Sequence, residues 1–486
     1  MPCNWITCDN ALRVDWRSVC PPIGKSVKQV GDDLFSASDE NININFENEG
    51  GETYICGNPP YIGRRNQNKE QKEELKSLLG SKIKSSASLD YVFGWMEKAS
   101  EYVSHDGGEF AFVTTNSVVQ GTQIPIFWPY LFSKGVKINF AHRSFKWANS
   151  AANNAGVTVV IIGIGKNRHP KRIFDDDIVR EVNEIGPYLL PGSESIVQTR
   201  SKPLSELSKM SYGNLPGDGN HLSLTLAEKD VLLNKHPEVE RLILPLYGAQ
   251  EFIRGLQRYC VWINDDDLEI ALSIPEIAAR IEKVRTTRES SKDRSYNALA
   301  NRPHQYRDRN LAEISTILAP QVSSETRKYL PTDLLGGFVG TTNQAFALYD
   351  APLWNMALLA SRIHMVWIAT VCGKLKTDFR YSNTLGWNTF PVPPLTEKNK
   401  ADLTRCAEDI LLSREAHFPA TIADLYNPET MPDNLRRAHE RNDEVLERIY
   451  IGRKFKNDTE RLEKLFQLYT KMTEVDENST QTRGNA

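Results

Sequence analysis

The tetrapeptide Asn58-Pro59-Pro60-Tyr61 is the part of the sequence whose residue types point most directly to chemistry. The exocyclic amine of adenine is a poor nucleophile because its lone pair is delocalised into the ring. Two acceptors aimed at its hydrogens would draw the nitrogen towards sp³ geometry. The Asn58 carboxamide oxygen and the Pro59 carbonyl supply such a pair, and proline holds its own backbone rigidly. Tyr61 then offers an aromatic face for a base turned out of a duplex.

A simple turn is the alternative interpretation of these four residues, because Asn-Pro-Pro is also a natural loop sequence. The surroundings favour a ligand site. The tetrapeptide follows Gly57 and the short apolar run 53–56, which predicts a buried strand. Open α/β sheets bind their ligands beyond the carboxyl ends of the strands, which is where this tetrapeptide would lie.

Residues 1–170 are predicted to form an α/β domain. Short apolar runs indicate buried strands, and residues 89–103 have apolar positions at helical spacing. Strands that alternate with helices favour a mostly parallel sheet. The predicted strands are residues 53–56, 110–115, 137–142 and 157–164.

The rest of the chain divides into two further regions and a tail. Residues 171–395 hold many short apolar runs separated by Gly, Pro, Asn and Asp, which predicts an α+β domain with long loops. Residues 396–475 show apolar faces with a period of about 3.6 residues, which predicts a helical domain. The polar tail 476–486 is predicted to be disordered.

Composition sets broad limits on this chain of 486 residues. Its formal net charge of -3 neither supports nor excludes nucleic acid, because binding requires a basic face and not a basic chain. No apolar stretch approaches the roughly 20 residues that span a bilayer, and the N-terminus has no signal pattern. We therefore expect a cytoplasmic protein without membrane contact. The seven cysteines are irregularly spaced and predict neither a metal site nor disulfides.

Eight segments resemble, in order, the MmeI-like family, which comprises the methyltransferase regions of single-chain restriction–modification enzymes with the γ-class motif order. The resemblance extends over nearly the whole chain. The segments are residues 57–80, 88–103, 108–123, 140–163, 317–331, 349–368, 373–393 and 424–443.

The resemblance implies S-adenosylmethionine-dependent adenine-N6 methylation of a short site in double-stranded DNA. Asn58, Pro59, Pro60 and Tyr61 match the family's catalytic motif. Phe145 is similar to the aromatic residue that stacks on the other face of the flipped adenine, although a core aromatic is the alternative. The predicted pocket wall consists of Asp90, Tyr91 and Asn116, where helix capping and strand termination explain Asp90 and Asn116 equally well.

A second set of residues is expected to read DNA bases. Lys376, Asp378 and Arg380 alternate, so on an extended segment they share one face. The resemblance implies base readers beside the target adenine. A lysine suits the two acceptors of guanine, and Asp378 suits the cytosine amine. A solvated strand face is the alternative.

Residues 283–310 are rich in Arg and Lys and are expected to contact DNA phosphates, which give affinity and register but no sequence preference. A solvated helix with charge pairs one turn apart is the alternative. The residues expected to make these contacts are Arg285, Arg288, Lys292, Arg294 and Arg302.

The sequence departs from the family upstream of Asn58. Only 57 residues precede it, and none resembles the Gly-rich turn and acidic residue that bind the cofactor. We therefore expect an incomplete Rossmann-like methyltransferase sheet in a truncated or split enzyme. A partner to consider is an N-terminal fragment that carries the cofactor-binding and nuclease parts. The alternative function is a DNA-binding specificity subunit, or a decayed remnant, that transfers no methyl group by itself.

Overall fold

The computed structural model describes residues 7–20, 53–147, 157–192, 195–375 and 377–484. The chain forms two compact units, residues 1–198 and residues 199–486. The fold class predicted from the sequence is confirmed: an α/β sheet domain is followed by a region of sheets and helices and then by a helical region.

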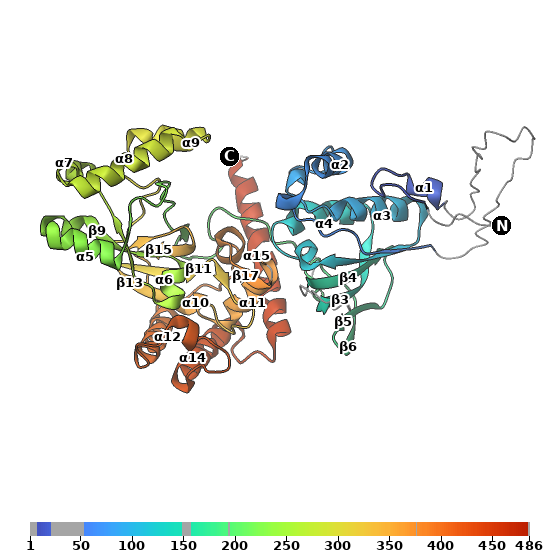
Figure 1. Ribbon diagram of the computed structural model, residues 1–486. Coiled ribbons are helices and arrows are strands. Elements are labelled where there is room, and N and C mark those ends of the chain that lie inside the picture. Colours follow the sequence, from blue (N-terminus) through green and yellow to red (C-terminus); the bar gives the residue numbers. More distant parts are fainter. Residues whose placement is uncertain (1–6, 21–52, 148–156, 193–194, 376, 485–486) are drawn as a thin grey trace, which may run out of the picture. The chain divides into compact units, whose positions relative to one another are not determined.

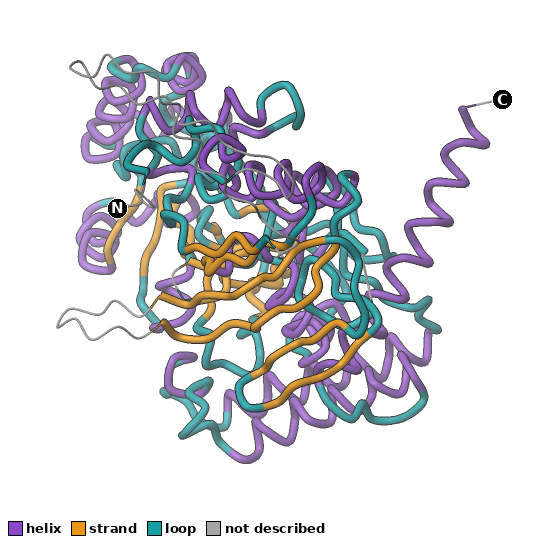
Figure 2. The backbone as a smooth tube through the Cα atoms, turned by 90° about the vertical axis from the view of Figure 1, so that its right-hand side faces the viewer, coloured by secondary structure: helices purple, strands orange, loops and turns teal. Residues whose placement is uncertain are grey.

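The described part of the first unit is built on a six-stranded sheet with the order β1-β2-β4-β3-β5-β6 (Figures 1 and 2). Strand β1 is parallel to β2 and β3 is parallel to β5, whereas β4 is antiparallel to both of its neighbours and β6 is antiparallel to β5. The strands are β1 Tyr54–Gly57, β2 Glu109–Thr115, β3 Lys137–Trp147, β4 Val157–Gly165, β5 Lys171–Asp175 and β6 Ile178–Val182.

The sheet is mixed, so the prediction of a mostly parallel sheet is wrong. The connection between β3 and β4, residues 148–156, is shorter than the crossover of about a dozen residues that a parallel pair requires. Strand β4 therefore runs back beside β3. The sheet also continues past the boundary predicted at residue 170, because β5 pairs with β3 and β6 pairs with β5.

Strands β1, β2 and β3 point in the same direction, because β1 is parallel to β2 and both β2 and β3 are antiparallel to β4. Their carboxyl ends consequently lie at one edge of the sheet. The register makes this concrete, since Thr115, Val159 and Phe145 form a row across β2, β4 and β3. The segment that follows β1 begins at this same edge.

The helices of the first unit pack on the sheet through their apolar faces. Residues alternate in burial along β2, and Phe93 of α3 meets Phe127 of α4 with ring centroids 4.5 Å apart. Gly163 of β4 is required for packing, because a Cβ there would lie 2.0 Å from the Phe140 ring. The helical elements are α1 Trp16–Val19, η1 Arg64–Asn66, α2 Lys69–Leu79, η2 Ser86–Ser88, α3 Phe93–Asp106, η3 Asn116–Val119 and α4 Gln123–Ser133.

The second unit contains three small sheets in its described residues, with the orders β14-β9-β10-β8, β13-β11-β15-β7 and β12-β17-β16. The strands are β7 Ser211–Tyr212, β8 Ser223–Thr225, β9 Ile243–Tyr247, β10 Arg258–Val261, β11 Ser315–Pro320, β12 Val322–Ser323, β13 Asp333–Gly336, β14 Gly340–Thr341, β15 Ala345–Tyr349, β16 Gly373–Leu375 and β17 Asp378–Arg380.

Helices surround these sheets and supply much of the core of the second unit. Helices α10 and α11 are almost wholly buried, and the π-helix η7 follows β17. The helices up to this point are α5 Leu226–Lys235, η4 Pro237–Leu242, α6 Ala249–Arg254, η5 Asp265–Asp267, α7 Leu268–Ser273, α8 Pro275–Glu289, α9 Arg294–Asn297, η6 Ala298–Asn301, α10 Trp354–Leu359, α11 Arg362–Val371 and η7 Asn383–Trp387.

The last part of the second unit is helical, in agreement with its sequence periodicity. Helix α15 continues to Gly484, whereas the sequence predicted a disordered tail from residue 476; no Gly or Pro interrupts the helix before its end. Among the described residues, no helix is both long and apolar enough to cross a membrane. The helices are α12 Glu397–Glu415, α13 Ile422–Leu425, α14 Asp433–Ile451 and α15 Asp458–Gly484.

Candidate functional site

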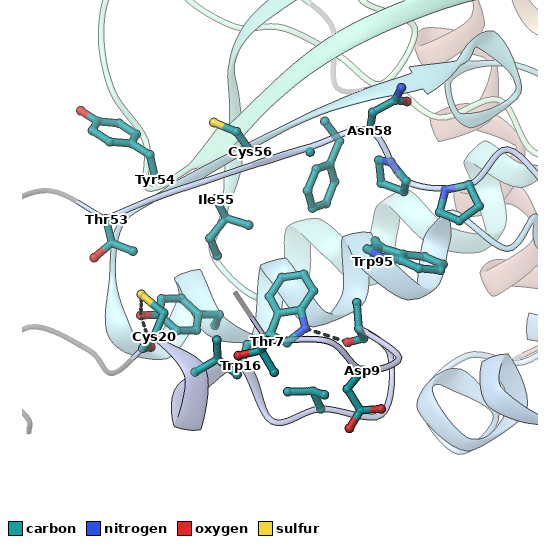
Figure 3. Close-up of a pocket in the computed structure, with 18 residues that line it drawn as sticks. Thr7, Asp9, Trp16, Cys20, Thr53, Tyr54, Ile55, Cys56, Asn58 and Trp95 are labelled. Carbon is teal, nitrogen blue, oxygen red and sulfur yellow. Dashed lines mark hydrogen bonds between the residues drawn. The ribbon is translucent and has the colours of Figure 1, made fainter. Parts of the chain in front are cut away.

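The tetrapeptide 58–61 lies directly beyond the carboxyl end of β1, where the sequence places it (Figure 3). Asn58 is exposed and Tyr61 is half-buried. The Tyr61 hydroxyl donates a hydrogen bond to the Asn58 carboxamide oxygen and lies 3.3 Å from the Val113 carbonyl oxygen of β2. Burial raises the pKa of Tyr61, so its hydroxyl stays protonated and able to donate at neutral pH.

This arrangement leaves acceptor capacity free at the edge of the sheet. A carboxamide oxygen has two lone pairs, so the bond from Tyr61 leaves one for a second donor on Asn58. The Pro60 carbonyl accepts from the Ile62 amide at 3.2 Å, but no donor within the described part of the chain reaches the Pro59 carbonyl. Asn58 is exposed and Pro59 is buried, and each of these adjacent residues keeps an unused acceptor in the described structure.

The loop that follows the tetrapeptide is tied to the start of α3 and to α4. Asp90 accepts from the Arg64 amide at 2.9 Å and from the Gln123 side chain at 2.7 Å, and its own amide donates to Gln123 at 2.9 Å. The Tyr91 amide donates to the Ile62 carbonyl at 2.9 Å. Asp90 thus anchors the loop backbone at Arg64. Spacing along the sequence did not indicate this contact, because the two residues lie far apart along the chain.

Tyr91 does not form the pocket wall that the sequence predicted. Its side chain is buried, and its hydroxyl donates to the Glu74 carboxylate of α2. Its ring packs edge-on against Trp95, with centroids 4.9 Å apart. Tyr91 faces the helical core because α2 covers the beginning of α3, which the apolar periodicity of α3 alone could not specify.

Asn116 and Phe145 lie at the same edge of the sheet as the tetrapeptide. Asn116 follows β2 and is buried, and its carboxamide oxygen accepts from the Ser144 hydroxyl of β3 at 2.8 Å. Phe145 is the next residue of β3 and is half-buried, just after a register shift between His142 and Phe145. The fold therefore brings Asn58, Asn116 and Phe145 to one edge.

A largely apolar cavity of about 530 Å³ lies beside β1 and reaches Asn58. Figure 3 shows the rings of Trp16 and Trp95 on the side of β1 that faces the N-terminal segment, with Asn58 at the strand's end. The Trp16 indole is fixed by a 2.7 Å hydrogen bond to the Ala11 carbonyl. Asp9 is the acidic residue among those that line the cavity.

The sequence interpretation missed both tryptophans of this cavity. A usable signal exists for Trp95, which lies four residues after Tyr91 and so on the same face of the helix. None existed for Trp16, since its position depends on how residues 7–20 fold back onto α3. Across the described residues, no group of three or more His, Cys, Asp or Glu side chains is arranged to hold a metal ion.

The segment expected to read bases forms a β-hairpin in the second unit. Strands β16 and β17 pair antiparallel, with Leu375 opposite Asp378. Arg380 is exposed and Asp378 is half-buried, whereas Lys376 lies outside the described residues. Burial lowers the pKa of Arg327, and the Asp378 carboxylate opposes this effect only in part.

The basic stretch 283–310 divides into surface residues and buried ones. Lys292 and Arg294 are exposed, and Arg285 is half-buried beside Glu282, its i,i+3 partner at 3.2 Å. Arg302 is half-buried and donates to the backbone carbonyls of Tyr306 and Arg307. These two carbonyls, and not solvent, take up much of the Arg302 donor capacity.

The expectation that Arg288 contacts a DNA phosphate is wrong, because the residue is buried. Its side chain is only 1% exposed. Its guanidinium donates to the carbonyls of Gly217, Leu299, Arg302 and Gln305 at 2.7 to 3.0 Å. The number of charges along the sequence could not distinguish Arg288 from its neighbours. The sequence does not show whether an arginine is buried and bonded to backbone carbonyls or exposed to solvent.

Three consecutive parts of the chain match three domains of known proteins. Residues 2–175 match the family described as "MmeI, DNA-methyltransferase domain". Residues 191–394 match "MmeI, target recognition domain", and residues 395–475 match "MmeI, C-terminal domain".

Two similar proteins span nearly the whole chain. "DNA methyltransferase A" of Bacillus subtilis (strain 168) is 41% identical over 471 residues, which are 96% of this chain and 50% of that protein. The solved structure of "Type IIL restriction-modification enzyme MmeI in complex with DNA" is 32% identical with a TM-score of 0.80, and the match covers 96% of this chain and 60% of that one. The chain thus spans half the length of the curated relative.

Fold and sequence together define the class of this protein: a methyltransferase-type sheet domain joined to a target-recognition region and a helical C-terminal region. The chain belongs to the MmeI-like family.

The burial of Arg288 leads to a testable distinction between stability and DNA binding. Arg288→Met should lower the free energy of unfolding by about 2–4 kcal/mol, because several buried carbonyls lose their donors together. Lys292→Met, at an exposed neighbouring position, serves as the matched control and should leave stability within about 0.5 kcal/mol. Urea unfolding measures both. Equal stability of the two variants would contradict the structural role of Arg288.

Proposed function

We propose that the chain is the catalytic and target-recognition part of an S-adenosylmethionine-dependent DNA methyltransferase that modifies adenine N6 in a restriction–modification system. The observation that carries this proposal is the pair of available acceptors on Asn58 and Pro59 at the carboxyl end of β1. Membership of the MmeI-like family supports it.

In this proposal the edge of the sheet receives an adenine that has been turned out of the duplex. The Asn58 and Pro59 oxygens accept the two N6 hydrogens, which localises the nitrogen lone pair. Tyr61 holds the Asn58 carboxamide through its hydroxyl and offers one ring face, while Phe145 offers the opposite one. When bound, the cofactor would supply the methyl group by cleavage of its sulfonium S–C bond, and N6 would lose one proton to solvent as the N–C bond forms.

The described residues fit the cofactor only in part. The rings of Trp16 and Trp95 supply an apolar wall near Asn58, which suits the flat adenosyl group. Polar partners for a ribose and an amino-acid group are few there, since Asp9 is the acidic residue at the cavity. None of the 57 residues before Asn58 resembles the Gly-rich turn and acidic residue that bind the cofactor in the family. We therefore assign only part of the cofactor site to these residues.

A further segment is proposed to complete the site beside β1. Within the described residues β1 pairs with β2 alone, and Tyr54 of β1 is 57% exposed. In this proposal the further segment lies beside β1, next to the cavity and to Asn58. An N-terminal fragment that carries the cofactor-binding and nuclease parts is the partner that fits this position.

Double-stranded DNA is the proposed substrate, and the solved structure of the similar enzyme MmeI in complex with DNA supports this choice. Lys376, Asp378 and Arg380 are proposed to read bases, since the described part of their hairpin leaves Arg380 exposed. Lys292, Arg294 and Arg285 are proposed to contact phosphates. A cytoplasmic location agrees with a DNA substrate.

The role of Asn58 is tested by Asn58→Ala in an active assembly that contains this chain. Loss of an acceptor that strengthens in the transition state should raise the barrier by about 2–4 kcal/mol, a fall in rate of roughly 30-fold to 10³-fold. Affinity for DNA should change little, because contacts with backbone phosphates, which Asn58 does not make in this proposal, supply most of it. The readout is N6-methyladenine in digested DNA, measured by mass spectrometry. A rate near that of the wild type would mean that the tetrapeptide is only a turn.

Cofactor binding by the chain alone tests the partial site. Titration calorimetry with S-adenosylmethionine should detect weak binding or none, because the ribose and amino-acid groups find few partners. Binding of DNA by the same preparation controls for correct folding. A micromolar dissociation constant would contradict the proposal of an incomplete site and would remove the need for an N-terminal fragment.

Base reading is tested by reversing the charges of the hairpin. Lys376→Glu together with Asp378→Arg should change the preference at one base pair from G to C, with each good contact worth about 1–3 kcal/mol of discrimination. Lys398→Glu with Glu408→Arg, two exposed positions on α12, repeats the same charge changes away from the hairpin. Methylome sequencing reports the motif. An unchanged motif in the hairpin variant would favour the solvated-face interpretation.

A further inference from the structure

The loop directly after the tetrapeptide 58–61 carries two adjacent exposed arginines that the proposed mechanism does not use. Arg64 and Arg65 lie in η1, only three and four residues after Tyr61. Three residues of chain span at most about 11 Å and four at most about 14 Å, so both side chains start close to the proposed adenine site. Neither guanidinium has a hydrogen bond or an ion pair within the described part of the chain.

Most other arginines of the first unit behave differently. Five of them lie within 4 Å of a carboxylate, and only Arg180 of β6 resembles Arg64 and Arg65 in having no acidic partner among the described residues. The five paired residues are Arg13, Arg17, Arg143, Arg168 and Arg172. An exposed pair of like charges left without counter-ions is therefore uncommon in this unit.

The acidic residues nearest in sequence do not neutralise this pair. Glu70 and Glu74 of α2 both contact Arg13, and Glu73 lies 3.9 Å from Lys69. The Asp90 carboxylate does contact the loop, but it accepts hydrogen bonds from the Arg64 backbone amide and from the Gln123 side chain. None of these carboxylates therefore forms an ion pair with either guanidinium.

The backbone beneath these arginines is fixed. Besides the contact with Asp90, the Asn66 amide bonds to the Gly63 carbonyl at 2.8 Å. The buried Gln67 side chain donates to the Leu89 carbonyl at 3.0 Å. The two arginines therefore project from a positioned turn. A fixed turn reduces the conformational entropy that ordering the arginines on a ligand would cost.

We propose that Arg64 and Arg65 bind backbone phosphates of the DNA strand that carries the target adenine. The proposal rests on the function proposed above. Turning a base out rotates its nucleotide about the strand's backbone, so the flanking phosphates must be held close to the pocket that receives the base. A guanidinium group can donate two hydrogen bonds to one phosphate. Such contacts do not depend on the DNA sequence. In this way η1 would hold the DNA backbone at a fixed position relative to Asn58.

The test uses the full chain and a duplex of mixed sequence, with affinity measured by fluorescence anisotropy between about 50 and 200 mM salt. Arg64→Gln with Arg65→Gln should reduce the slope of log affinity against log salt by about 1–2, because each lost phosphate contact contributes about 0.9. Arg64→Lys with Arg65→Lys keeps the charges and should retain most of the slope. Arg180→Gln is the matched unpaired arginine and should leave it unchanged.

The outcomes separate this proposal from the one on which it rests. A wild-type chain that binds DNA while the double glutamine variant keeps the same slope would overturn the phosphate contact alone. A double glutamine variant that loses no more slope than Arg180→Gln would do the same. A wild-type chain with no affinity for DNA would overturn both proposals. Circular dichroism of each variant confirms that the fold is retained, which is expected because both side chains are exposed.

Discussion

The hydrogen bond from the Tyr61 hydroxyl to the Asn58 carboxamide oxygen is the interaction on which the proposed site depends. Asn58 is exposed, and an exposed carboxamide is free to rotate unless something holds it. Tyr61 is half-buried against the end of β2 and so provides a fixed donor. The bond consumes one lone pair and aims the other, which is the geometry that an acceptor for an amine requires.

The remainder of the first unit keeps this pair in place. The parallel pairing of β1 and β2 brings Val113 close to the Tyr61 hydroxyl, and the reversed strand β4 places β3 so that Phe145 shares the edge. Asp90 then holds the loop after Tyr61 from the other side, through the Arg64 amide. Because Asp90 also bonds to Gln123 of α4, these contacts fix the loop backbone relative to that helix.

Sequence patterns predicted the local features of this structure well and the directions of its side chains poorly. Strands β1, β2 and β4 lie within a few residues of their predicted bounds, because apolar periodicity depends on neighbouring residues. The same patterns did not reveal that Tyr91 faces α2 or that Arg288 is buried, since both facts depend on which distant element covers the residue. The antiparallel course of β4 follows from the short connection between β3 and β4, residues 148–156. The length of this connection can be counted in the sequence once both strands are located.

The orienting role of Tyr61 is tested most directly by the single-turnover rate of methyl transfer in an active assembly that contains Tyr61→Phe. Phenylalanine keeps the ring face and removes only the donor. The account predicts a rate about 5–10-fold below that of the wild type, from the loss of roughly 1 kcal/mol of hydrogen bonding, with unchanged affinity for DNA. Tyr61→Ala should fall further, by about 1–3 kcal/mol of base stacking. A Tyr61→Phe rate equal to that of the wild type would contradict the claim that this hydroxyl holds Asn58 in its catalytic orientation.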